Sequence, residues 1–423
     1  MKNAFKVSLL SSVAAATVTL MTAGTAQATN GMLMHCVGVD RCGMGGAGVA
    51  MGTSATDAAI NPALGAKLGN TYQVNMGMFK ADIKGFSTHS ANGTLAAKRY
   101  TNMESGKNYF PNGSLGVNYK LSDDSSFNIY VGPGSGGAVI WNNSRTYGFN
   151  STSQQDTSME YKTIHLQPSY AVEYAGAKWG VGAVLSRGTI ETNAFWGSFG
   201  GTNYYGDGTT DTFYGAGFHL GTAFDLDENV HMGLAYRSPI WHRDMADTYK
   251  NKVFSSPIDI PAQIHAGVAV DATDALTIAA DLKFVQYGSV QTIGNSPADL
   301  VQLPYGNVNS GFGWEDQMIY MLGVSYALTD STTLRAGYNH GDSPIKDSMT
   351  WENMLYPAII EDHFTVGASQ KITDNMELGF SAYLAPEAKQ TEDGTVYAAN
   401  ALTAGSWLKH KQKGFQLSFK HDF

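Results

Sequence analysis

The sequence predicts an all-β protein: a transmembrane antiparallel β-barrel of about 14 strands with a small N-terminal plug in its lumen. Three observations support this fold class. From about residue 71 onward, apolar residues recur at every second position, the pattern of a β-strand. Short polar turns alternate with long polar connections. Past residue 28, no apolar run approaches the roughly 20 residues that a membrane-spanning helix needs.

The apolar residues keep one parity within each predicted strand. In segment 275–287 the apolar positions are even-numbered, and small or polar residues occupy the odd-numbered positions between them. The two rows are Leu276, Ile278, Ala280, Leu282 and Phe284 against Thr277, Ala279, Asp281 and Lys283. In a membrane barrel the apolar row faces lipid and the other row faces the lumen. In a soluble sandwich the apolar row would instead face a core.

The lengths of the connections favour the barrel over the sandwich. Short turns rich in Asp, Asn, Ser, Thr or Gly fall near 122–125, 175–178, 225–229, 272–274, 329–331 and 373–375. Long polar connections cover about 85–111, 141–157, 193–210, 242–259, 288–312, 342–359 and 386–411. Outer-membrane barrels have tight periplasmic turns and long outer loops. The barrel is therefore expected over residues 70–423, with both termini in the periplasm.

The first 28 residues have the features of a secretory signal peptide. Lys2 and Lys6 give a positive start, residues 7–21 form an apolar stretch, and residues 26–28 (Ala-Gln-Ala) offer a small-x-small cleavage site. The mature chain is expected to start at Thr29. An uncleaved membrane anchor is the alternative interpretation.

Composition narrows the function classes. Charged residues make up 15% and aromatic residues 11%, whereas disordered chains have high charge and few aromatics. The net charge of -9 argues against a nucleic-acid partner. No G-x-S-x-G nucleophile motif occurs, and the 11 histidines are scattered. Neither an enzyme nor a cofactor is expected.

Residues 29–69 differ from the rest of the chain. They lack strand alternation, are rich in Gly and Ala, and are too few to fold alone, so they are expected to form a plug inside the barrel. This segment holds the two cysteines of the chain, Cys36 and Cys42, which are expected to form a disulfide in an oxidising compartment. A metal site with His35 is the alternative, but three ligands fall short of the usual four. No metal is expected.

The plug carries two motifs. Residues 43–50 read Gly-Met-Gly-Gly-Ala-Gly-Val-Ala, and Asn61-Pro62-Ala63 follows. With segments 217–238 and 314–345, these motifs resemble the FadL-type family of outer-membrane transporters for long-chain fatty acids and other hydrophobic compounds. The resemblance covers essentially the whole mature chain. It marks Gly43, Gly45 and Gly46 with Asn61, Pro62 and Ala63 as the signature of the family's N-terminal hatch.

Each motif also has a simpler interpretation. The spacing of the three glycines at 43, 45 and 48 fits a dinucleotide-binding loop, but that loop needs a preceding strand and a following helix, which are absent here. The glycines are instead expected to allow tight turns and close packing. Asn-Pro also starts ordinary turns. The resemblance implies that Asn61-Pro62-Ala63 anchors the hatch to the barrel wall, and the two interpretations are compatible.

The resemblance also implies a route for the ligand. The ligand lands on an outer site, passes to a site near the hatch N-terminus, and leaves sideways into the bilayer through a gap at an inward kink of the third strand. Gly132, Pro133 and Gly134 are the candidates for the kink, because Pro lacks a ladder donor and Gly often marks a bulge. The alternative is that the strand ends at Val131.

Seven residues are candidates for ligand binding. By resemblance, the start of the hatch lies near the high-affinity pocket, and flexible Met side chains suit apolar ligands; a disordered terminus is the alternative. A fatty-acid carboxylate would need a cation in the lumen, and strand parity nominates three, although such charges often pair with lumen carboxylates such as Asp281 or Glu377. The candidates are Asn30, Met32, Leu33 and Met34, and the cations Arg237, Lys283 and Arg335.

The expected function is passive uptake of long-chain fatty acids or other hydrophobic compounds across the outer membrane of a Gram-negative bacterium. A diffusion porin for polar solutes and a structural or adhesive barrel are the alternatives. Expected partners are hydrophobic small molecules, outer-membrane lipid, and the barrel assembly machinery, which would engage the C-terminal strand ending at Phe423. A monomer is expected, because a plugged barrel needs no partner subunit.

Overall fold

The computed structural model describes residues 30–88, 101–141, 157–192, 208–243, 257–296, 311–395 and 404–423, together with the backbone of strand segments 195–199, 202–205, 300–303 and 306–309. The expected signal peptide and Thr29, the expected first residue of the mature chain, lie outside the described residues. Among the described residues, no helix is both long and apolar enough to cross a membrane.

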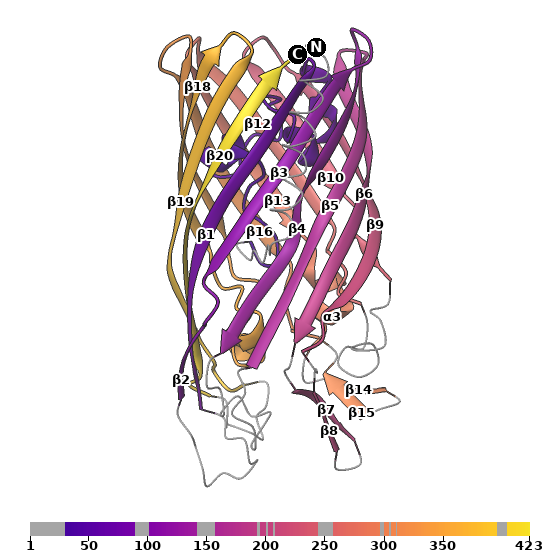
Figure 1. Cartoon of the computed structure of the whole chain (residues 1–423), viewed down its shortest axis with the longest axis vertical. Coiled ribbons are helices and arrows are strands. Elements are labelled where there is room, and N and C mark those ends of the chain that lie inside the picture. Colours follow the sequence, from indigo (N-terminus) through magenta and orange to yellow (C-terminus); the bar gives the residue numbers. More distant parts are fainter. Residues whose placement is uncertain are drawn as a thin grey trace, which may run out of the picture.

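Fourteen antiparallel strands form one closed ring (Figure 1). Neighbouring strands pair in chain order, and the last strand returns to the first, with Asp422 opposite Thr71. The prediction of an antiparallel barrel of about 14 strands is confirmed. The strands are β1 (Thr71–Ser87), β3 (Tyr109–Lys120), β4 (Ser125–Trp141), β5 (Thr157–Tyr174), β6 (Ala177–Thr192), β9 (Asp211–Asp225), β10 (Val230–Arg237), β12 (Gln263–Thr273), β13 (Leu276–Val285), β16 (Gln317–Ala327), β17 (Thr332–Gly341), β18 (Asp362–Thr373), β19 (Met376–Thr391) and β20 (Trp407–Asp422).

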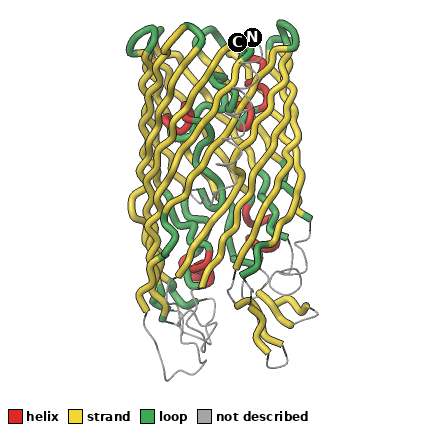
Figure 2. The backbone as a smooth tube through the Cα atoms, in the orientation of Figure 1, coloured by secondary structure: helices red, strands yellow, loops and turns green. Residues whose placement is uncertain are grey.

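Shorter elements lie inside the barrel or beyond one end (Figure 2). The N-terminal segment contains α2 (Val39–Gly43), η1 (Asp57–Ala59) and η2 (Pro62–Lys67). The long connections contribute η3 (Tyr287–Ser289), α3 (Gln291–Gly294), η4 (Asp347–Met349), η5 (Glu352–Leu355) and the strands β2 (Thr101–Glu104) and β11 (Trp241–His242). A separate sheet of β7 (Phe195–Phe199), β8 (Thr202–Tyr205), β14 (Leu300–Leu303) and β15 (Gly306–Asn309) lies beyond the end away from the termini (Figure 1).

The two faces of each strand are sorted as the alternation predicts. On β13, Ile278 and Leu282 are 38% and 50% exposed, whereas Asp281 and Lys283 between and beside them are 3% and 8% exposed. The apolar row therefore faces out and the polar row faces the lumen. A soluble protein rarely exposes a continuous apolar surface of this kind, whereas lipid covers it on a membrane barrel.

Several strands run further than the hydropathy pattern predicts. The connection expected at 386–411 is shorter, because β19 continues to Thr391 and β20 already begins at Trp407. Each of the added residue pairs includes at least one polar side chain, and Lys389 lies opposite Lys409. Backbone pairing does not require lipid contact, so strands can continue past the depth at which alternation of apolar residues marks them.

Residues 30–69, which we call the hatch, lie within the barrel and are bonded to its wall from several sides. The Asp281 carboxylate accepts from the backbone N–H groups of Gly48 and Val49, both at 2.8 Å. The Asn61 side-chain amide donates to the Thr222 carbonyl of β9 at 3.0 Å. Asn61 also caps η2 by accepting from Ala63 N–H, with Pro62 at the first position of the turn. Asn61 thus both starts the turn at η2 and bonds the hatch to the barrel wall.

A buried ion pair organises the hatch internally. The Arg41 guanidinium donates to both carboxylate oxygens of Asp57, at 3.0 and 3.1 Å, and to the Met51 carbonyl. Gly48 lies against this guanidinium at a φ of +121°, and a Cβ there would come within 2.2 Å of Arg41 Nη1. The glycine is required both by its backbone conformation and by the space that Arg41 fills.

Candidate functional site

A cavity of about 80 Å³ lies between the start of the hatch and the lumen wall. The hatch contributes the stretch from Leu33 to Val37 and Gly46, and β4 contributes Pro133 and Gly134. The remaining wall is mixed: apolar side chains come from Ala59, Ile60, Ala235 and Met321, and polar ones from Tyr130, Gln167, His219, Gln263, His265, Arg237 and Lys283. Segments far apart in the sequence thus meet here: the hatch, the predicted kink and two of the three nominated cations.

The start of the hatch is held as a tight turn. Asn30 and Leu33 exchange two backbone hydrogen bonds, at 3.0 and 3.1 Å. The Tyr287 hydroxyl donates to the Asn30 carbonyl at 2.6 Å and accepts from Met32 N–H at 3.1 Å. Met32 and Leu33 are fully buried or nearly so. The residues nominated from the sequence therefore lie at the cavity, with Leu33 and Met34 lining it and Asn30 and Met32 holding the turn.

The third barrel strand is irregular at the nominated residues. Pairing of β4 with β3 stops at Val131, opposite Leu115. Pairing with β5 continues, but its register shifts between Pro133 and Gly136. The strand itself runs on to Trp141, so it does not end at Val131 as the alternative held. At Gly134 a Cβ would lie 2.0 Å from His165 Nε2, so the close approach of this ring requires glycine.

The hatch occupies the place beside β4 that β3 leaves. Leu33 forms an isolated antiparallel bridge with Ser135, and Gly136 N–H donates to the Met32 carbonyl at 2.9 Å. Ser135 N–H is also satisfied, by the Thr163 hydroxyl at 2.8 Å. These bonds satisfy backbone groups that the irregular strand would otherwise leave unpaired in a membrane wall.

Lys283 is buried and Arg237 is partly buried at the cavity, and within the described residues neither forms an ion pair with a carboxylate. Arg237 Nε has no hydrogen-bond partner. The carboxylate nearest in sequence to Lys283, Asp281, is already engaged by the hatch N–H groups and by His265 Nε2 at 2.9 Å. Buried cations are normally paired. Two unpaired cations at one cavity therefore favour an anionic ligand group.

The third nominated cation lies elsewhere. Arg335 does not line the cavity; its guanidinium lies 3.2 Å from the Asp40 carboxylate of α2 and donates to Ser369. Arg335 is thus paired with a carboxylate, which was the alternative to ligand binding. The partner comes from the hatch, however, and is neither Asp281 nor Glu377. The hatch-motif glycines lie nearby: the Thr365 hydroxyl donates to the Gly43 carbonyl at 3.1 Å and accepts from Gly45 N–H at 2.8 Å.

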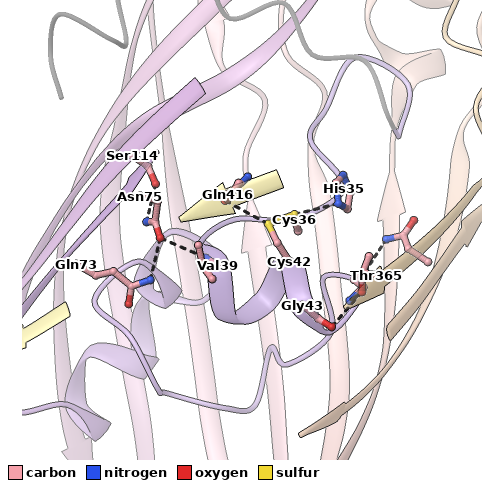
Figure 3. Close-up of a disulfide and its surroundings, with 12 residues drawn as sticks. His35, Cys36, Val39, Cys42, Gly43, Gln73, Asn75, Ser114, Thr365 and Gln416 are labelled. Atoms are coloured by element: carbon pink, nitrogen blue, oxygen red, sulfur yellow. Dashed lines mark hydrogen bonds between the residues drawn. A yellow bond between two sulfur atoms is a disulfide. The ribbon is translucent and has the colours of Figure 1, made fainter. Parts of the chain in front are cut away.

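Cys36 and Cys42 form a disulfide that joins the cavity wall to α2 (Figure 3). His35 Nε2 lies 3.1 Å from Cys36 Sγ, and these three residues are the one group of potential metal ligands found in the described part of the chain. Both sulfurs are in the disulfide, which removes the thiolates that a metal would need. Burial, and secondly the charge of Lys283, lowers the pKa of His35 to about 3.

Two parts of the site could not be nominated from the sequence. Tyr287 lies in a long connection, where no periodicity marks its role. The same holds for the residues that fill the lumen on the far side of the cavity from the termini: Trp314 Nε1 donates to the Asn353 side chain at 2.6 Å, and Trp141 Nε1 donates to the Met354 carbonyl at 2.9 Å. By contrast, strand parity could have nominated the polar lining residues of β4, β5, β9 and β12.

A closed barrel with an apolar outer surface, an internal hatch and a buried cavity beside it defines a plugged membrane β-barrel. The sequence model of the family described as "Outer membrane protein transport protein (OMPP1/FadL/TodX)" matches residues 19–423, and the chain belongs to this family. The resemblance seen in the hatch motifs is thereby confirmed. The family comprises transport proteins of the Gram-negative outer membrane and not enzymes, as expected from the sequence.

Solved structures show the same fold. The chain superposes on the toluene transporter TodX of P. putida with a TM-score of 0.67 at 16% identity, covering 93% of this chain and 99% of that one. For a Pseudomonas aeruginosa FadL homologue the TM-score is 0.66 at 16% identity, covering 93% and 100%. For the toluene transporter TbuX of Ralstonia pickettii it is 0.64 at 14% identity, covering 92% and 99%. Comparison with curated protein sequences gave no match.

Proposed function

We propose that this protein takes up long-chain fatty acids, holding the carboxylate between Arg237 and Lys283 at the cavity beside the hatch. The observation that carries the proposal is that two cations at the cavity, the buried Lys283 and the partly buried Arg237, have no carboxylate partner in the described chain. Leaving charges buried and unpaired is costly, so an anionic ligand gains from meeting them. The Leu33 and Met34 side chains offer the apolar contact that an acyl chain needs.

A neutral aromatic hydrocarbon is the second candidate, because TodX and TbuX are described as toluene transporters. Such a ligand would bury apolar surface against Met34 but would leave Arg237 and Lys283 without an anionic partner. The charge of the lining therefore favours a carboxylate. A porin for polar solutes is less well supported, because the hatch lies in the lumen and is bonded to the barrel wall on several sides. An adhesive barrel is also less well supported, because it would need no ligand cavity.

The size of the cavity bears on the exit route. A volume of about 80 Å³ corresponds to roughly six water-sized positions, since one water needs about 10–15 Å³. This suits a headgroup and a few methylenes. The rest of a long acyl chain would extend along the irregular part of β4, beside Pro133 and Gly134. We propose that the ligand leaves sideways into the bilayer where β4 separates from β3.

The test compares ligands on the detergent-purified barrel by intrinsic Trp fluorescence. A long-chain fatty acid, an alkyl-aromatic and a small sugar are titrated against the protein and against a variant that lacks residues 30–34. Saturable binding of the fatty acid that is lost on truncation is the expected result. Binding of the alkyl-aromatic alone would select the second candidate. Binding of neither apolar ligand would contradict the transport proposal.

A further inference from the structure

We propose that the Cys36–Cys42 disulfide is a positioning element of the ligand cavity, which couples the cavity-lining stretch 33–37 to helix α2 and through it to the barrel wall. The inference rests on the proposed ligand site, because it assigns a role to one wall of that cavity. Cys36 itself lines the cavity, and both cysteines are almost fully buried. The disulfide thus belongs to the wall that a ligand would touch.

The stretch carrying Cys36 has few other attachments. Before it, residues 30–33 are fixed by Tyr287 and by β4. After it, Gly38 accepts from Cys42 N–H at 2.9 Å. Between these points, and within the described part of the chain, the backbone of residues 34–37 forms no hydrogen bond. The covalent bond through Cys36 is therefore its principal link to the rest of the hatch.

The other end of the disulfide is firmly attached. Helix α2 packs on β18 and β19. Val39 N–H donates to the Asn75 side chain of β1 at 3.3 Å, and the Gly43 carbonyl accepts from Thr365 of β18 (Figure 3). Cys42 lies between these two anchors. The disulfide therefore restrains the cavity lining relative to the barrel wall.

His35 packs between the disulfide and the wall. Its ring stacks on His363 of β18 with a centroid separation of 4.7 Å and an interplanar angle of 10°, and it contacts Tyr383 of β19 at 4.5 Å. His35 Nε2 also lies against Cys36 Sγ. Breaking the disulfide would remove the covalent restraint on Cys36, which contacts the His35 ring, and on Cys42. Gly38, at a φ of +75°, is the point about which the stretch could then turn.

The test uses the full-length barrel in oxidised and reduced form. A water-soluble phosphine cleaves the bond to two thiols and becomes the phosphine oxide, with oxygen from water; oxidised glutathione then restores the disulfide. We expect reduction to raise the dissociation constant for a long-chain fatty acid roughly tenfold, because the loosened wall must be ordered again on binding. We expect reoxidation to restore it. A Cys36→Ala, Cys42→Ala double variant should have the dissociation constant of the reduced protein, and the phosphine should not change it.

A matched control loosens the hatch away from the cavity. Lys420 donates to the Thr53 carbonyl at 3.0 Å, and Lys420→Met is expected to leave the affinity unchanged. Heat-modifiable electrophoretic mobility verifies that each barrel is folded. If the double variant fails to fold, the reduced wild-type protein supplies the comparison. Unchanged affinity after complete reduction, while the oxidised protein binds, would overturn the proposal.

Amide hydrogen exchange separates this inference from the proposed function. If the oxidised protein binds none of the ligands, the function fails, and exchange at the hydrogen-bonded amides of Val39 and Cys42, next to the stretch 34–37, still tests the positioning role. We expect faster exchange of these two amides on reduction, with residues 71–87 of β1 unaffected. Equal exchange in both forms would overturn the inference regardless of any ligand.

Discussion

The Met32 carbonyl accepts a hydrogen bond of 2.9 Å from Gly136 N–H, so the first turn of the hatch pairs with the third barrel strand where β3 no longer does. One contact thus joins the two features that a ligand would meet in succession: the cavity wall and the irregular strand. Because the hatch satisfies backbone groups of β4, movement of the hatch and opening of the wall are expected to be coupled.

The irregular strand is tested by Gly134→Ala. The new methyl group would collide with the His165 ring, which must then shift and disturb the cavity. We expect uptake of a labelled fatty acid to fall severalfold at equal surface expression. Gly69→Ala is the matched control, because nothing lies within 4 Å of a Cβ there and its φ is ordinary. Equal uptake by both variants would mean that the shape of β4 at this point is irrelevant to transport.

The anchor of the hatch is tested by Asp281→Ala. The change leaves Gly48 N–H and Val49 N–H buried without their acceptor, at a cost of about 1–3 kcal/mol. We expect the hatch to become more susceptible to protease and the ion conductance of the barrel in planar bilayers to rise. Asp274→Ala in the exposed turn before β13 should change neither. A hatch as resistant as the wild type would show that other contacts suffice to hold it.

The N-terminal turn is tested by Tyr287→Phe. The hydroxyl both donates to the Asn30 carbonyl and accepts from Met32 N–H, so its loss leaves Met32 N–H buried without a partner and the Asn30 carbonyl with only its bond from Leu33 N–H. A cost of about 1–2 kcal/mol corresponds to a rise in dissociation constant of roughly tenfold. Fluorescence titration measures it. Tyr174→Phe, at an exposed strand end, is the control, and affinity equal to that control would exclude a role for the hydroxyl.

The burial of His35 predicts a pH dependence. Its pKa is lowered to about 3 in the folded protein, by burial first and then by Lys283, against about 6.5 when unfolded. The unfolded hatch therefore binds more protons below pH 6.5, and hatch stability falls as the pH drops. Between pH 6.5 and 5 the loss is roughly 2 kcal/mol.

Protease susceptibility of the hatch as a function of pH measures this loss. His35→Gln removes the titrating group, and its pH dependence is expected to be weaker than that of the wild type. The charged and titratable neighbours Lys283 and His363 remain in both proteins, so the difference between the two curves reports on His35. Identical curves would contradict the assignment.

The barrel could be predicted from the sequence because lipid imposes one rule on every strand. Leu282 must face out and Asp281 must face in, and this alternation can be read without knowing any neighbour. The rule stops where lipid stops, which is why the polar ends of β19 and β20 were missed. The hatch has no periodicity, and its motif was found only by resemblance.

The site was predictable to the extent that it lies on strands or beside proline and glycine. Parity nominated Arg237 and Lys283, and composition nominated Pro133. Strand parity predicts which way a side chain points but not what it contacts. It therefore could not exclude Arg335 from the ligand site, although its carboxylate partner Asp40 comes from the hatch. Tyr287 was missed because a long connection folds back into the lumen, and only the tertiary structure brings it to Asn30.

The central claim is that the cavity binds a carboxylate through Arg237 and Lys283. The most direct measurement compares a long-chain fatty acid with the alcohol of equal chain length, each titrated against the wild-type barrel and an Arg237→Gln, Lys283→Gln double variant. We predict that the wild type binds the acid at least tenfold more tightly than the alcohol and that the double variant loses this preference while still binding the alcohol. Equal affinity of the wild type for acid and alcohol would contradict the account.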